Sequence, residues 1–487
     1  MSKNFPRHDE LKEVIKLLSK EAAAYFKKLD RLPVRDSKAD KTAKSFIKPL
    51  PENGAGAAKS LKLLIDKSYS AAVHSAGPRF FHFVVGGSTP AAFGADWITS
   101  MLDQIAYAWV TSPLAVRLEL LSLSWLKELF ELPAHWSGVM VTGATMANFV
   151  CLAAAREWWG EKYGRGISEE GFTGLPPVPV LSGDHIHASA VKCLAMLGIG
   201  RASDKKFIAD PSGRMDLNLL EDYLRGLKGS PAIIIGTAGE PNAGAFDPVD
   251  QLADLADKYG AWLHIDGAFG LFARVSPSAK YLAKGVERAH SVSVDGHKWL
   301  NVPYDCGFSF VNDGRLLGKA FAYNAAYLPD PDDPHPNMGS IGPESSRRAR
   351  SLTVWATLNA YGRKGVREMV DKHIKLARRM GQLVDDSPVL ERLADVTLNI
   401  VCFRYNPGNL DEEKLNSINK ELGEALLSDG RYYAGTTTYK GMTALRPAIV
   451  NWRTNEKNID EFIDVITELG KKTERNFRKS GKSLIVN

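Results

Sequence analysis

The sequence has few cysteines, and the four that it has do not form close pairs. Cys151, Cys193, Cys306 and Cys402 lie far apart, with no C-x-x-C spacing. This pattern disfavours a disulfide scaffold and a cysteine-based zinc site. It suits the reducing cytoplasm, which is the location we expect.

Other absences narrow the class of protein further. The 42 glycines and 25 prolines show no period and no heptad pattern persists, which disfavours collagen-like and coiled-coil structures. A hydrophobic fraction of 44% is sufficient to offset chain entropy, so global disorder is disfavoured as well. The net charge of +6 is spread over 487 residues, and no nucleic-acid partner is expected. The N-terminus lacks an apolar run before its first charges, and this predicts no signal peptide.

One long segment has no charge at all. Residues 135–155 contain no Asp, Glu, Lys or Arg, and this length approaches that of a membrane span. Polar residues and glycines interrupt the segment, which breaks at Thr142-Gly143. A strand, a glycine turn and a buried helix explain it better, so we expect no membrane partner.

Short apolar runs alternate with segments of helical periodicity between about residues 90 and 375. The expected strands are Gly138–Val141, Val178–Leu181, Lys206–Ala209, Ala232–Gly236, Trp262–Ile265 and Ser291–Val294. The expected helices are Thr145–Trp159, His187–Leu197, Asp216–Leu227 and Val249–Tyr259. This alternation predicts an α/β fold with a mostly parallel sheet covered on both faces. Ligands of such folds bind beyond the carboxyl ends of the strands.

The composition changes on either side of this region and suggests three segments. Residues 1–90 form an N-terminal helical segment that is too thin for a core of its own, so we expect it to pack on a partner surface in a homodimer. Residues 91–375 form the large domain. Residues 376–487 form a small α+β domain, with helices at Lys375–Asp385, Glu412–Leu427 and Asn458–Phe477 and strands near Val396–Tyr405 and Leu445–Asn451.

Three candidate sites follow strands directly. Asp266 ends the run WLHI, and Lys298 follows SVSV within His297-Lys298-Trp299. The turn 142–145 consists of small residues, which let backbone N–H groups approach an anion such as phosphate. Each feature has a plainer explanation when taken alone: a helix cap, a surface lysine or a tight turn. In this chain order they match what pyridoxal phosphate (PLP) needs, because a lysine holds its aldehyde as an imine and a carboxylate keeps its ring nitrogen protonated.

The chain resembles the PLP-dependent group II decarboxylases, the family of aromatic-L-amino-acid and glutamate decarboxylases. The resemblance covers nearly the whole chain and rests on PRFFHFVVGGSTPAA (78–92), SPLAVRLE (112–119), GVMVTGATMAN (138–148), DHIHASAVK (184–192), IGTAG (235–239), LHIDGAFG (263–270), DGHKWLNVPYDCG (295–307), AAYLP (325–329) and SRRARSL (346–352). It implies a type I fold of PLP enzymes that builds each site from two chains.

The resemblance also implies roles for individual residues. Lys298 would form the imine and Asp266 would bind the ring nitrogen, while His187 and Ala268 would cover the two ring faces. Thr237 would lie near the ring. The phosphate would be held by Ala144, Thr145 and His297. Tyr327 would protonate the substrate α-carbon, in the site of the neighbouring subunit.

The histidines allow one other interpretation, which is a metal site. His185 and His187 alternate, and His264 and His297 lie on other strands. Without a cysteine or carboxylate cluster to complete a tetrahedral set, we predict no metal.

The sequence departs from the family pattern at several positions. Met146, Asp295, Glu240-Pro241 and Phe269 replace the family's usual residues. A carboxylate that faces phosphate would repel it, so we expect Asp295 to point away. These departures do not change the assignment of the cofactor, but they put the identity of the substrate in doubt.

The predicted activity is decarboxylation of an L-amino acid to an amine and CO2, which makes the protein a lyase of amino-acid metabolism. An aromatic substrate is favoured, with a phenolic ring above an indole. Phe81 and Phe83 occupy a segment that lines the side-chain pocket in relatives, and Ser346 goes with phenolic substrates in plant relatives. The alternatives are an aromatic aldehyde synthase, expected to lack Tyr327, and a decarboxylase of an acidic amino acid. An aminotransferase that uses Arg446, or a relative without cofactor, fits less well.

Overall fold

The computed structural model describes residues 6–209, 213–323 and 335–479. They divide into two compact units. Unit 1 comprises residues up to 85 together with 379–393 and 402 onward, and unit 2 comprises 86–378 and 394–401. The boundaries near 85 and 378 lie close to those expected from composition, but the first and last predicted segments belong to one unit. The three-domain division remains a prediction.

Unit 2 contains a seven-stranded sheet in the order β1-β7-β6-β5-β4-β2-β3. Its strands are β1 (Ser137–Val141), β2 (Val180–Ser182), β3 (Asp204–Lys206), β4 (Ile233–Thr237), β5 (Trp262–Asp266), β6 (Ser291–Asp295) and β7 (Gly307–Val311). Only β7 runs antiparallel to its neighbours. The mostly parallel α/β sheet predicted from the sequence is confirmed, and β7 is an addition that the alternation did not predict.

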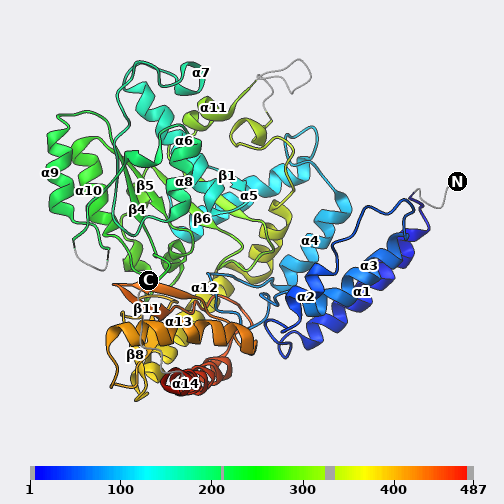
Figure 1. Ribbon diagram of the computed structural model, residues 1–487. Helices are drawn as coiled ribbons and strands as arrows, with labels where there is room; N and C mark the ends of the chain where they lie inside the picture. Colours follow the sequence, from blue (N-terminus) through cyan, green and yellow to red (C-terminus); the bar gives the residue numbers. More distant parts are fainter. Residues whose placement is uncertain (1–5, 210–212, 324–334, 480–487) are drawn as a thin grey trace. The chain divides into compact units, whose positions relative to one another are not determined.

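Helices cover both faces of this sheet, because the strands are apolar on both sides. Ile235 belongs to the core cluster formed with helix α6 (Ala144–Glu161). At the next residue, a Cβ on Gly236 would lie 2.9 Å from the Leu252 side chain of α10 (Val249–Tyr259). Successive residues of a strand face opposite sides, so α6 and α10 lie on opposite faces, as Figure 1 shows.

The charge-free segment is split as predicted. It forms β1, a short turn and the start of α6, whose residues Ala147 and Val150 are fully buried. The remaining helices that begin in unit 2 are α4 (Pro90–Leu102), α5 (Pro113–Phe130), α7 (Ile167–Glu170), α8 (Ala188–Met196), α9 (Leu217–Gly226), α11 (Arg315–Phe321) and α12 (Ser351–Asp385). Its short 3-10 helices are η1 (Arg201–Ser203), η2 (Gly270–Val275), η3 (Lys280–Ala283), η4 (Val286–Arg288) and η5 (Met338–Ser340). In the described parts of the chain, no helix is long and apolar enough to cross a membrane.

Unit 1 combines an antiparallel sheet with helices from both ends of the chain. The sheet has the order β10-β11-β9-β8 and consists of β8 (Leu390–Arg392), β9 (Phe403–Tyr405), β10 (Thr436–Tyr439) and β11 (Met442–Leu445). Its helices are α1 (Glu10–Lys28), α2 (Ala39–Lys44), α3 (Ala57–Ala71), α13 (Glu412–Asp429) and α14 (Glu456–Lys479). A parallel bridge joins Phe80 to Tyr433. Helices α1 and α3 contain no buried residue.

Candidate active site

The candidate residues gather at one edge of the unit 2 sheet. Strands β4, β5 and β6 are parallel neighbours, and β1 runs in the same direction as β6 because each is antiparallel to β7. The carboxyl ends of these four strands therefore meet at the same edge. Thr237 and Asp266 are the last residues of β4 and β5, and Ala144 and Lys298 lie in the segments that follow β1 and β6.

Asp266 is held at the end of β5 by two hydrogen bonds. Its Oδ1 accepts from the Ala268 N–H at 3.1 Å, and its Oδ2 accepts from the Asn148 Nδ2 at 2.9 Å. The residue is only 4% exposed. These two bonds fix the orientation of the carboxylate at the end of the strand.

Lys298 lies in the turn after β6, and its ammonium group is paired. Its Nζ is 2.9 Å from Oδ2 of Asp295 and 5.8 Å from the centre of the Phe269 ring. The Lys298 side chain remains 21% exposed, so an aldehyde can reach it. Gly86 packs against this turn, where an added Cβ would lie 2.0 Å from the Lys298 carbonyl oxygen, and only glycine fits there.

The prediction that Asp295 points away from the cradle is wrong. Its Oδ1 accepts the N–H of Ala144, the first residue of α6, and lies 3.2 Å from Nε2 of His297. Three groups of positive character thus surround this buried carboxylate: a helix N-terminus, an imidazole and the Lys298 ammonium. The prediction was based on repulsion between the carboxylate and a phosphate. It did not take these three neighbours into account.

His297 presents a hydrogen-bond donor to the same place. Burial lowers the pKa of its ring, which is therefore neutral near pH 7. Its Nδ1 accepts from the Cys306 N–H at 3.1 Å, so its proton lies on Nε2. A Cβ on Gly143 would lie 2.9 Å from Cε1 of this ring. The turn before α6, the imidazole and the lysine form a cradle of donors for an anion, and in this structure the anion that they bind is the Asp295 carboxylate.

Two further predicted residues lie at the same sheet edge. Thr237 donates its backbone N–H to Asp247 at 2.8 Å and its hydroxyl to the His185 carbonyl at 3.2 Å. His187 caps helix α8, where its Nδ1 accepts the Ser189 N–H at 3.2 Å. The His187 ring is exposed and available to a ligand. Thr237 is 3% exposed, and its two hydrogen bonds hold the backbone in place at this edge of the sheet.

The structure explains one departure from the family pattern. Glu240 is 3% exposed, and its carboxylate accepts the N–H groups of Asn242 at 2.7 Å and of Ala243. It therefore stabilises its own turn. Met146 lies in α6 and packs against the core cluster. Nothing in the structure explains the choice of Met at that position.

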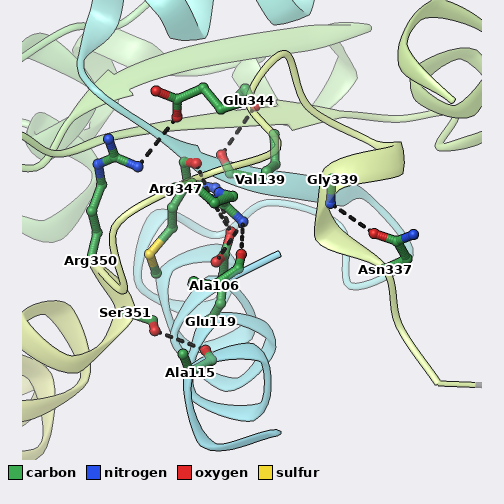
Figure 2. Close-up of polar contacts among 12 residues, drawn as sticks. Ala106, Ala115, Glu119, Val139, Asn337, Gly339, Glu344, Arg347, Arg350 and Ser351 are labelled. Carbon is green, nitrogen blue, oxygen red and sulfur yellow. Dashed lines mark hydrogen bonds and ion pairs between the residues drawn. The ribbon is translucent and has the colours of Figure 1, made fainter. Parts of the chain in front are cut away.

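The arginines after Ser346 hold the fold together. Arg347 forms a bidentate ion pair with Glu119 at 2.9 and 3.0 Å and also donates to the carbonyls of Ala106 and Met140 (Figure 2). Arg350 binds Asp305 at 2.7 Å. Both guanidinium groups are thus neutralised inside the protein, while Ser346 is exposed.

The two predicted substrate phenylalanines of unit 1 differ in their surroundings. Phe81 is 1% exposed and packs on Tyr432 and Phe462, with ring centroids 6.0 and 5.2 Å away. Phe83 is 59% exposed. Phe81 therefore belongs to the core of unit 1, whereas the Phe83 ring lies at its surface.

Other predicted features cannot be placed or were not foreseen. Tyr327 lies outside the described residues. No group of three or more His, Cys, Asp or Glu side chains that could hold a metal ion occurs in the described ranges. Asn148, which binds Asp266, was missed. The only sequence signal for Asn148 was its position: it is a polar residue in the first turns of a charge-free helix, just after the predicted phosphate-binding turn.

Comparison with known proteins identifies the family. The model for the pyridoxal-dependent decarboxylase conserved domain matches residues 64–406. The chain belongs to this family. It is 30% identical to an aromatic-L-amino-acid decarboxylase of Bacillus atrophaeus over 429 residues, which are 86% of this chain and 87% of that protein. It is 28% identical to a phenylacetaldehyde synthase of Arabidopsis thaliana over 486 residues, which are 94% and 96% of the two chains.

A solved structure agrees with this membership. The crystal structure of Oryza sativa TDC with PLP and tryptamine matches with a TM-score of 0.88 at 25% identity, covering 96% of this chain and 98% of that one. The protein is a PLP-dependent amino-acid decarboxylase, as predicted. An accessible lysine and a buried carboxylate at one sheet edge fit this cofactor, while the cradle donors bind the Asp295 carboxylate, which a phosphate would have to displace.

Proposed function

We propose that the protein decarboxylates an aromatic L-amino acid, with a phenolic ring preferred to an indole. The observation that supports an aromatic substrate best is the neutralisation of the buried arginines: Arg347 and Arg350 are both bound to carboxylates of the protein. A substrate with a second carboxylate needs a dedicated cation.

We assign the residues the roles that the family resemblance implies. When bound, PLP supplies an aldehyde that links to an amino group and a ring that takes up the electrons of the broken bond. Lys298 provides the amino group, and Asp266 holds the proton on the ring nitrogen. His187 and Ala268 cover the ring faces, with Thr237 beside it. Ala144, Thr145 and His297 hold the phosphate, and Tyr327 supplies the proton to the α-carbon.

The proposal predicts that amine formation is fastest with tyrosine or dihydroxyphenylalanine. We expect Ser346→Gly to shift the kcat/KM ratio toward tryptophan by about tenfold, the effect of about one lost hydrogen bond to a phenol. The measurement is kcat/KM for tyrosine, dihydroxyphenylalanine, phenylalanine, tryptophan and glutamate. The control is Ser345→Gly, because Ser345 contacts Tyr323 instead.

The same assay separates the alternatives. Aldehyde and hydrogen peroxide in place of amine would favour the aldehyde synthase activity that one relative's name records. Preference for glutamate, or no turnover of any aromatic amino acid, would overturn the substrate proposal.

We also propose that the protein is a homodimer, in which helix α4 and the segment after it contact the second copy. This part of unit 2 exposes large apolar side chains, which a soluble monomer rarely gathers in one place: Trp97, Ile98, Met101, Leu102, Val110 and Leu114 are 42–75% exposed. Met101→Glu should weaken association at least tenfold in sedimentation equilibrium. Leu219→Glu, on the exposed face of α9, is the control. A fully active wild-type monomer would contradict the proposal.

The cytoplasmic location also remains a prediction.

A further inference from the structure

A chain of buried hydrogen bonds leads from the interior of unit 2 to Asp266. Asn148 lies between them: its Nδ2 is 2.9 Å from Asp266 Oδ2, and its Oδ1 is 2.8 Å from His264 Nε2 and 2.6 Å from Ser293 Oγ. On the other side of the His264 ring, Nδ1 is 2.9 Å from Ser291 Oγ. The Ser291 Oγ in turn accepts from the Trp262 indole N–H at 3.1 Å. Asn148, His264, Ser291 and Ser293 are all 0% exposed.

The chemistry of these groups fixes the direction of every bond. The Asp266 carboxylate can only accept, so Asn148 must turn its NH2 group toward it and its oxygen toward His264 and Ser293. His264 must then carry its proton on Nε2. Burial lowers the pKa of His264 to about 4, so the ring is neutral near pH 7 and its Nδ1 accepts from the Ser291 hydroxyl. The indole N–H of Trp262, a donor only, satisfies the Ser291 oxygen.

From this directed chain we infer that Asn148 and His264 are positioning residues for the ring nitrogen of the cofactor, acting through Asp266. Each donor points toward the carboxylate, and hydrogen bonds in such chains polarise one another in a buried setting. The chain therefore fixes the rotamer of Asp266 and leaves its carboxylate in place to bind a protonated ring nitrogen. This inference rests on the proposed role of Asp266.

Three other features agree with a role in the site. The bonds add side-chain links between α6 and the paired strands β5 and β6, at the level of the sheet where His264 lies opposite Ser291 and Asp266 opposite Ser293. A packing role alone would be served by an aliphatic side chain, because burying several polar groups is unfavourable unless all of them are satisfied. Here all are satisfied, and the last acceptor is the carboxylate that faces the sheet edge.

The test compares two ligands on the complete protein: PLP and its deaza analogue, in which carbon replaces the ring nitrogen. Asn148→Leu removes the donor to Asp266 at similar volume. We expect it to weaken PLP binding by about tenfold to a hundredfold, the range for a hydrogen bond to a charged group. Binding of the deaza analogue should change less than about threefold, because the analogue has no nitrogen to sense the carboxylate.

Asn419→Leu is the matched control. It is the same substitution at another asparagine that is 0% exposed, in unit 1, where the amide binds the backbone of Tyr405 and Leu415. It should alter neither affinity by more than about threefold. Ser293→Ala removes one donor to the Asn148 oxygen and leaves a smaller void, so it serves if Asn148→Leu does not fold. We expect it to weaken PLP binding about threefold, again without an effect on the analogue.

The outcomes separate this inference from the proposed function. Equal losses for PLP and the analogue in Asn148→Leu and Ser293→Ala would overturn the inference and leave a packing role. If the wild type itself bound the two ligands equally, the role of Asp266 at the ring nitrogen would fall, and the inference would fall with it. Selective loss of PLP binding in both variants supports the positioning role.

Discussion

Replacing Lys298 with alanine is expected to abolish both the imine absorbance of bound PLP and amine formation. The Lys298 ammonium group, 2.9 Å from Asp295 and 21% exposed, is the amine that we assign to the imine. No hydroxyl or amide could replace it, because only an amine forms this reversible link with an aldehyde. Activity should therefore drop below detection rather than by a measurable factor.

The decisive measurement is the mass of the protein after borohydride reduction in the presence of PLP. Reduction fixes an imine permanently, so the wild type should gain the mass of one reduced cofactor and Lys298→Ala should gain none. Lys284→Ala is the control, since the Lys284 side chain is 72% exposed and forms an ion pair with Asp250 at 3.5 Å. An unchanged imine band and normal turnover in Lys298→Ala would refute the assignment.

The variant should still fold. Asp295 would lose its ion pair with Lys298, but it would keep the Ala144 N–H and the His297 imidazole as partners. A buried carboxylate with two remaining donors costs far less than one with none. Thermal unfolding of Lys298→Ala is thus expected within a few degrees of the wild type, which separates lost chemistry from lost structure.

The sequence was sufficient to predict the main sheet, because its parallel strands are short, apolar and separated by amphipathic helices. Strand β7 was missed because it follows β6 through a short connection without a helix, and it pairs antiparallel on both sides. The small strands β8 and β10 were missed as well. They are three and four residues long, and β10 is largely exposed, so neither has a clear apolar signal.

The candidate site was predictable only where a residue follows its own strand. Asp266 and Lys298 have this signal in the local sequence, whereas Asn148 does not. Its partners Asp266, His264 and Ser293 lie 116 to 145 positions away, so only the fold brings them together. The error for Asp295 has the same origin: its orientation is set by Ala144, 151 positions away, and not by its neighbours in sequence.

Replacing Asp266 with asparagine is expected to lower kcat on the order of 10³-fold, because fixed charges aimed at the reacting group provide terms of this size in enzymes. The two Asp266 oxygens accept from the Ala268 N–H and from Asn148 Nδ2. Asparagine can keep one of these bonds, but its NH2 group then faces a donor. We therefore also expect a stability loss of about 1–3 kcal/mol.

Glu157→Gln separates the two effects. Glu157 is a comparably buried carboxylate of α6, 1% exposed, and it binds Arg156 at 2.9 Å and Ser168 at 2.8 Å. It should lose a similar amount of stability while retaining nearly all of its kcat. Denaturant unfolding and steady-state kinetics on both variants provide the comparison. Near-wild-type turnover in Asp266→Asn would refute the role at the ring nitrogen. Equal kinetic losses in the two variants would mean that Asp266, like Glu157, serves only the fold.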